Sequence, residues 1–516
     1  MKRQILNIVN FIRGVEPRCE MDLVTPVRKQ IELAKKHGLK TTFLLQYDAL
    51  IDSTYTDMLF GLNDEMIEIG VWFEVVQPLC EKAGIRWEGR YPWDWHAHCG
   101  FSVGYTEAER EKLIDILFSD FRAKFGYYPR SFGAWAFDAH TLRYAADKYG
   151  LDAACNCKDQ WGTDGYNMWG GYYGQGYYPS KNNVFAPAQL PDNMIGVPVF
   201  RMLGSDPILQ YDLGLDVSVG ASTQGVVSLE PVYTGNIGGG GVPRWVDWYL
   251  DENFSGRCLS FGYAQAGQEN SFGWEKMKEG LKYQYARFEE MRDEGRLEVE
   301  TLGETGCWYK QMFAETPASA IAAMDDMDGS GRRSVWYSSK NYRVNIYAED
   351  GRFWIRDIHL FRDSYKERYL GGVCVTNNLT YDNLPFVDGY RFSGHGIRAG
   401  LYPVTDSGED MKYSEMLYQE RDGAAYVTFT GTPCGDVTFI LSEGDITVRK
   451  TGERPFALRH RYDDAAADKY IEVTGISPGR ISLRYNSFDY DIGIEMGELS
   501  ERDIVYKEGI KLDFTI

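Results

Sequence analysis

The sequence predicts an α/β barrel of the (β/α)7 type, followed by an all-β sandwich domain. Over the first 310 residues, short apolar runs alternate with helical patterns, which is typical of βαβ units around a parallel sheet. About seven such units favour a closed barrel over an open sheet. Beyond residue 332, apolar and polar residues alternate and helical patterns are scarce, which is typical of a sandwich.

The expected barrel strands are apolar runs bounded by polar or glycine-containing turns. They lie at residues 5–12, 41–45, 66–73, 131–137, 151–155, 197–202 and 259–263. Helices are expected between them at residues 27–37, 141–149 and 274–292, and from Thr106 onward. Thr106 begins its helix with a capping box, because Glu109 stands three residues on. Gly38 and Gly150 end two of the other helices.

Composition shifts predict the domain boundaries. A catalytic barrel is expected at residues 1–315, a linker rich in Ala, Asp and Gly at 316–332, and the sandwich at 333–516. Within the sandwich, Asp350 and Gly351 predict the turn of a hairpin. In the barrel, residues 160–187 are too long for a simple connection, so a functional loop is expected there.

Charge and composition exclude several classes of function. The 516-residue chain carries a formal net charge of −20, which argues against nucleic acid or an anionic membrane as partner. No window approaches 18 apolar residues, and the nine cysteines are odd in number and scattered. A cytoplasmic protein is therefore predicted, with secretion left open if a leader has been removed. Thirteen Trp and 36 Tyr offer faces that can stack on sugar rings.

Three carboxylates follow predicted strands in aromatic surroundings: Glu74, Asp138 and Glu269. Glycoside hydrolysis needs two, one held protonated by burial and one acting as a nucleophile or as a base that activates water. Each residue also has a structural interpretation. Asp138 is placed to cap the helix that follows it, and Glu269 to be a solvated loop residue.

Short motifs resemble known families. Trp135 and Asp138, followed by a helix and Gly150, resemble the W-x-x-E pattern of glycoside hydrolase family 57 and the W-x-x-D context of family 38 α-mannosidases. Residues 267–274 are similar to the family 57 stretch that carries the acid, and residues 67–74 to its substrate-binding glutamate. The chain thus resembles the glycoside hydrolase/deacetylase barrel superfamily, within a poorly characterised bacterial family.

The resemblance implies roles for individual residues. Asp138 would be the nucleophile and Glu269 the acid/base, both facing one cavity at the barrel mouth. The expected substrate-binding residues are Arg13, Trp72, Glu74, Asp94, His96, Trp135 and His140.

The motifs also depart from these families. Gly267 and Gln268 stand where family 57 has its acid, and the first strand lacks the ligands of family 38 and of deacetylases. No metal and no cofactor are therefore predicted. Asp94, His96 and His98 remain an alternative metal group, because alternate residues of a strand share one face.

These patterns predict a glycoside hydrolase that cleaves an oligosaccharide or glycoconjugate by a two-carboxylate mechanism, with carbohydrate as its partner. Two alternatives remain. One is a non-catalytic glycan-binding protein on a decayed barrel. The other is a metal-dependent carbohydrate deacetylase that uses Asp94 and His96.

Overall fold

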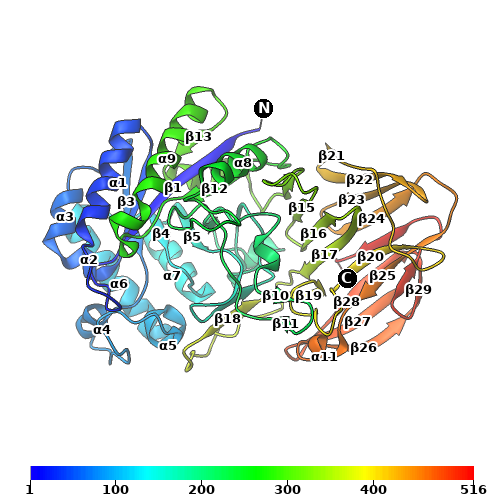
Figure 1. Ribbon diagram of the computed structural model, residues 1–516. Helices are drawn as coiled ribbons and strands as arrows, with labels where there is room; N and C mark the ends of the chain where they lie inside the picture. Colours follow the sequence, from blue (N-terminus) through cyan, green and yellow to red (C-terminus); the bar gives the residue numbers. More distant parts are fainter. Residues whose placement is uncertain (1, 516) are drawn as a thin grey trace.

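The computed structural model describes residues 2–515 and has two parts, a curled sheet surrounded by helices and a stack of antiparallel sheets (Figure 1). The central sheet orders its strands β12-β1-β2-β3-β4-β5-β9-β8, and β13 (Glu298–Glu300) pairs alongside β1. All but β8 (Gly176–Tyr177) run parallel to their neighbours. The parallel strands of this path are β1 (Gln4–Ile12), β2 (Thr41–Leu45), β3 (Ile67–Trp72), β4 (Ser131–Gly133), β5 (Ala153–Cys157), β9 (Val199–Met202) and β12 (Gly262–Ala266).

The two ends of the parallel sheet approach each other without a continuous ladder. The Gly204 amide, just past β9, donates to the Gln265 carbonyl of β12 at 3.0 Å. The sheet is therefore a curled half-barrel. The closed (β/α)7 barrel that the sequence predicts is not confirmed.

Helices cover the outside of the curled sheet (Figure 1). The capping box at Thr106 and Glu109 is confirmed, as are the left-handed glycine caps at Gly38 and Gly150. The helices are α1 (Val24–His37), α2 (Tyr47–Ile51), α3 (Ser53–Leu59), α4 (Gln77–Ala83), α5 (Ala97–Gly100), α6 (Glu107–Phe125), α7 (Ala139–Tyr149), α8 (Pro243–Asn253), α9 (Trp274–Asp293) and α10 (Leu302–Met312). Among residues 2–515, no helix has the length and apolar character needed to span a membrane.

One connection of the barrel is built from strands. Between β5 and β9 the chain forms β6 (Gln160–Thr163), β7 (Tyr166–Trp169) and β8. The segment expected to be a functional loop is therefore partly a hairpin. Its strand β7 also pairs in parallel with β18 (Leu379–Asp382) from the C-terminal part, so a three-stranded sheet joins the two parts.

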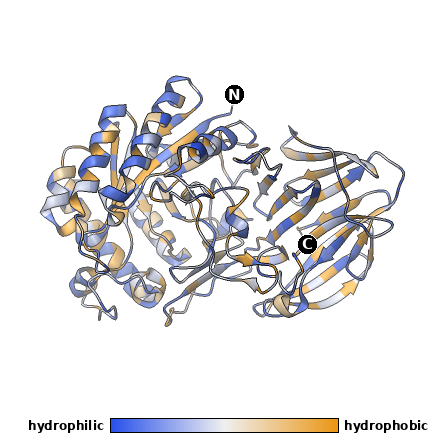
Figure 2. Ribbon diagram, in the orientation of Figure 1, coloured by the Kyte–Doolittle hydropathy of each residue, from blue (hydrophilic) through white to orange (hydrophobic). Residues whose placement is uncertain are grey.

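The C-terminal part is a β-sandwich of two large sheets. Hydrophobic and hydrophilic residues alternate along its strands (Figure 2), and one apolar cluster fills the space between the sheets. One sheet has nine strands: β14 (Ser319–Ala323), β15 (Arg333–Ser338), β16 (Tyr342–Glu349), β17 (Arg352–Leu360), β19 (Leu384–Asp388), β20 (Gly400–Thr405), β25 (Phe456–Arg461), β29 (Glu498–Ser500) and β30 (Asp503–Val505). The other has eight: β21 (Glu415–Arg421), β22 (Ala424–Thr432), β23 (Gly435–Leu441), β24 (Asp445–Lys450), β26 (Ile471–Ser477), β27 (Arg480–Tyr485), β28 (Phe488–Met496) and β31 (Ile510–Asp513).

Two details of the sandwich bear on the sequence predictions. The hairpin turn at Asp350 and Gly351 is confirmed, since both residues have positive φ between β16 and β17. The linker expected at residues 316–332 needs correction, because β14 lies inside it. β14 pairs antiparallel with β15 along its whole length, so the sandwich begins before residue 333.

Candidate functional site

A pocket of about 300 Å³ opens where the parallel strands end. Its lining residues follow different strands, because the carboxyl ends of parallel strands meet at one edge of the sheet. Arg13 follows β1, Trp135 follows β4, Lys158 follows β5, Leu203 follows β9 and Glu269 follows β12. This edge of the barrel is where the sequence analysis expected a site.

Glu269 and Glu74 both form ion pairs with Arg13. The Arg13 Nη1 lies 2.8 Å from the Glu269 Oε2, and its Nη2 lies 3.1 Å from the Glu74 Oε2. Arg13 is 2% exposed, and although burial opposes its charge, the two carboxylates raise its pKa. Ser271 donates to the second Glu269 oxygen at 2.6 Å. Glu269 therefore faces the pocket in a fixed orientation, while Glu74 lies behind it and orients Arg13.

A second buried glutamate, Glu230, lines the same pocket and was missed in the sequence analysis. Ser228 donates to its Oε2 at 2.9 Å, and the Gln268 side chain donates to its Oε1 at 3.3 Å. Burial raises the pKa of Glu230 to about 7, and the nearby negative charge of Glu269 adds to the increase. Glu230 can therefore hold a proton near neutral pH, which is the property required of a general acid.

Aromatic side chains form much of the pocket wall. Trp93, Trp95, Trp135, Tyr166 and Tyr233 all line it. The Trp93 ring lies 4.0 Å from the guanidinium carbon of Arg13, and its Nε1 donates to Glu74 at 2.9 Å. Ring faces beside fixed polar groups are suited to binding a sugar.

Asp138 does not line this pocket, and the expectation that it shares a cavity with Glu269 needs correction. Its carboxylate caps α7, accepting from the Thr141 amide at 2.9 Å and the Thr141 hydroxyl at 2.7 Å. Ser102 donates to it at 2.5 Å, and the Arg110 Nη1 lies 3.1 Å away. The physical reason is that β4 ends at Gly133, so the chain has already reached the start of α7 at Asp138.

We expect Asp138→Asn to keep turnover near that of the parent, because Asn caps a helix as well as Asp. The free energy of unfolding should fall by about 1–3 kcal/mol, since the buried Arg110 loses its charged partner. Activity assays and urea denaturation of the purified variant would test this. Lost turnover with unchanged glycan affinity would instead return Asp138 to the mechanism as the nucleophile.

The other predicted substrate-binding residues lie outside the pocket lining. Trp72 is buried and stacks on Phe11 at 3.8 Å. His140 lies on α7, with its Nε2 3.0 Å from the Glu111 Oε1 on α6. Of the predicted set, Arg13, Trp135 and Glu269 are the residues that the fold brings together in the pocket.

The Asp94 carboxylate forms an ion pair with Arg90. Burial acts to raise the pKa of Asp94, but hydrogen bonds from Arg90 outweigh it and lower the pKa to about 2. The His96 Nδ1 is 3.5 Å from the Asp94 Oδ1, and the His96 and His98 rings are stacked 5.9 Å apart. Within residues 2–515, no group of three or more His, Cys, Asp or Glu side chains has the arrangement of a metal site.

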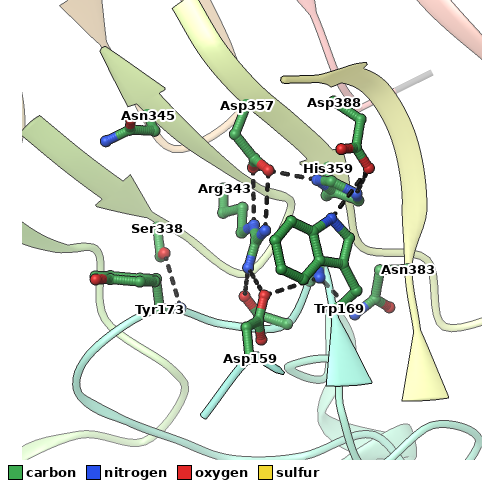
Figure 3. A network of polar contacts seen from close by, with 12 residues as sticks. Asp159, Trp169, Tyr173, Ser338, Arg343, Asn345, Asp357, His359, Asn383 and Asp388 are labelled. Atoms are coloured by element: carbon green, nitrogen blue, oxygen red, sulfur yellow. Dashed lines mark hydrogen bonds and ion pairs between the residues drawn. The ribbon is translucent and has the colours of Figure 1, made fainter. Parts of the chain in front are cut away.

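A polar network connects the pocket wall to the sandwich (Figure 3). Asp159, which lines the pocket after β5, accepts from the Gly170 amide at 2.9 Å and the Arg201 Nη2 at 3.2 Å. It also pairs with Arg343 of β16, and that guanidinium binds Asp357 of β17 at 2.8 and 2.9 Å. The sandwich therefore positions part of the pocket.

The sequence contained a signal for two of the pocket residues that were not predicted, Lys158 and Asp159. Lys158 and Asp159 lie three and four positions past the predicted strand at residues 151–155, so the same strand-end criterion that selected Glu269 would have selected them. Glu230 lies in an irregular segment, joined to β9 by the bond from the Leu229 amide to the Gly204 carbonyl at 2.8 Å. No periodic pattern in the sequence marks its position.

Comparisons with known proteins place the chain among barrels of this type. The model of a family described as a domain of unknown function with a solved structure, DUF3863, matches residues 110–347, which is less than half of the chain. No curated protein matches.

A solved structure from Parabacteroides distasonis, provisionally described as a glycoside hydrolase/deacetylase, aligns with a TM-score of 0.51 and 15% identity, over 74% of this chain and 88% of that one. A structure from Mycobacterium smegmatis, provisionally described as a polysaccharide deacetylase, aligns with a TM-score of 0.35 and 11% identity, over 61% of this chain and 94% of that one. The structure of a GH57-type branching enzyme from Pyrococcus horikoshii aligns with a TM-score of 0.33 and 10% identity, over 61% of this chain and 71% of that one. For the fold, the predicted resemblance to glycoside hydrolase/deacetylase barrels is confirmed by the first of these structures.

Proposed function

We propose that this chain is a carbohydrate-active enzyme, and specifically a glycoside hydrolase that cleaves an oligosaccharide or glycoconjugate with two carboxylates. The observation that carries the proposal is the pocket itself, where Glu230 and Glu269 lie buried among aromatic rings. This assignment keeps Glu269 from the motif but moves it from the acid/base role to that of nucleophile or base, and gives the acid role to Glu230, because the Asp138 carboxylate caps a helix outside the pocket.

The two glutamates have environments suited to different roles. Glu230 would donate its proton to the glycosidic oxygen as the bond from that oxygen to the anomeric carbon breaks. Glu269, ion-paired with Arg13, would attack the anomeric carbon or accept a proton from the attacking water. Two carboxyl groups with different environments are the pattern by which one site performs acid and base chemistry near neutral pH.

The test is turnover on a broad panel of aryl glycosides and oligosaccharides, with acetylated sugars included. Release of reducing ends supports the proposal. Release of acetate without cleavage would support the deacetylase alternative, and binding without turnover would support the glycan-binding alternative.

The pH profile gives a second expected result. Because the pKa of Glu230 is raised to about 7, its acid form predominates below that pH, and kcat should fall as the pH rises through about 7. Measuring kcat between about pH 5 and 9 checks this. A rate that increases across the same range would mean that Glu230 acts as a base.

A further inference from the structure

Lys158 is a buried cation with no anionic partner of its own. Its side chain follows β5, lines the pocket and is 7% exposed. Its ammonium lies over the ring of Tyr173, 5.4 Å from the ring centre. Although the Lys158 backbone amide donates to the Met202 carbonyl at 3.1 Å, the ammonium forms no hydrogen bond or ion pair with any of residues 2–515.

The carboxylate beside Lys158 is Asp159, and two arginines already pair with it. Asp159 pairs with Arg201 and with Arg343. Arg343 also binds both oxygens of Asp357 (Figure 3). Asp159 and Asp357 are therefore both paired with arginine. Neither carboxylate forms an ion pair with the Lys158 ammonium.

The arginines of the opposite wall differ from Lys158 in this respect. Arg13 is paired with Glu74 and Glu269, and Arg18 donates to Glu16 through Nε at 2.7 Å. Lys158 is therefore the buried cation of the pocket that a ligand could neutralise. A buried charge without a partner is unfavourable, and an anionic group on a ligand would supply that partner.

We propose that the pocket takes a negatively charged sugar and that Lys158 receives its anionic group, the carboxylate of a uronic acid or a sulfate ester. The inference rests on the proposed function and deepens it by naming the substrate class. The overall charge of −20 does not oppose it, because the recognition is local and the carboxylate beside Lys158 is neutralised by arginine.

The groups around Lys158 predict how the interaction depends on pH. Burial and the Arg201 guanidinium lower the pKa of Lys158 to about 7, against the opposing effects of Asp159 and Cys157. Tyr173 is the ring on which the ammonium rests. A bound anion favours the protonated amine, so affinity for a charged sugar should weaken as the pH rises above about 7.

The test is binding to matched sugars, measured by calorimetry on the full chain. Each uronic-acid oligosaccharide of a panel is compared with its carboxyl-reduced neutral counterpart and with the sulfated form of that counterpart. We expect at least one charged sugar to bind about tenfold or more tightly than its neutral partner, and the sulfated arm decides which anion is preferred. Equal affinity within all pairs, or no binding of any charged sugar at millimolar concentration, would overturn the proposal.

Variants assign the effect to Lys158. Lys158→Gln should abolish the preference for the charged sugar, and Lys158→Arg should retain it and extend it to higher pH. Lys282→Gln, on the exposed face of α9, removes the same charge and should change nothing. A preference that survives in Lys158→Gln would contradict the assignment. Because the readout is the difference in affinity between charged and neutral sugars and not a rate of cleavage, failure of this inference and failure of the hydrolase proposal give different results.

Discussion

Replacing Glu269 with Gln is expected to lower kcat by about 10²- to 10⁴-fold, the range associated with acid–base groups. The amide keeps the size of the side chain but loses the charge that attacks or accepts a proton. Arg13 keeps its pair with Glu74, so the fold should persist. Glu230→Gln should cause a loss of the same order, because an amide cannot donate the proton. Turnover measured beside glycan affinity tests both variants.

Glu275→Gln is the matched control. This glutamate is exposed in the first turn of α9, outside the pocket lining, so its variant should keep parental turnover. Near-parental activity in Glu269→Gln would remove that residue from the mechanism. A parent that binds glycans and turns over none of them would leave both glutamates as binding groups.

Replacing Arg343 with Met is expected to destabilise the protein by about 3–5 kcal/mol, the cost of breaking a buried ion pair. Arg343 is 1% exposed, and its removal leaves the Asp357 carboxylate without its bidentate partner. Burial acts to raise the pKa of Asp357, and Arg343 and His359 lower it. Removing Arg343 therefore raises that pKa and leaves a buried carboxyl group with His359 and Tyr211 as its remaining side-chain partners. Urea denaturation measures the loss.

Two further variants sharpen this result. Arg343→Lys keeps the charge but loses the planar fork, so an intermediate loss is expected. Arg484→Met breaks an exposed pair with Asp489 and should change stability little. An Arg343→Met variant as stable as the parent would show that the network does not hold the two parts together.

Much of the fold was predictable because local chemistry and tertiary structure agree. Apolar runs became buried strands, and Thr106 and Asp350 stand where a capping box and a tight turn were expected. The connection after β5 was harder, because Tyr166 to Trp169 form a strand by pairing with residues more than 200 positions later. β14 was missed for a different reason, because its small residues formed a strand by pairing with β15, the next strand along the chain.

The site was predictable only where a side chain lies within three positions of the end of a strand. Arg13, Trp135 and Glu269 meet that condition and line the pocket. Asp138 lies five positions past the last residue of β4, where α7 begins, so its carboxylate caps that helix. Glu230 reaches the pocket through an irregular segment, whose path depends on contacts that no local pattern encodes.

The strands β6, β7 and β8 between β5 and β9 make it difficult to separate the barrel from the sandwich. In a barrel closed by helices, a C-terminal domain can be exchanged as a separate piece. Here β7 pairs with β18, and Trp169 packs in one cluster with Trp336 and Tyr390 of the sandwich. A barrel transplanted alone would expose Trp169 and lose the Arg343 guanidinium that pairs with Asp159. Recombination, natural or engineered, therefore has to move both parts together to preserve one wall of the pocket.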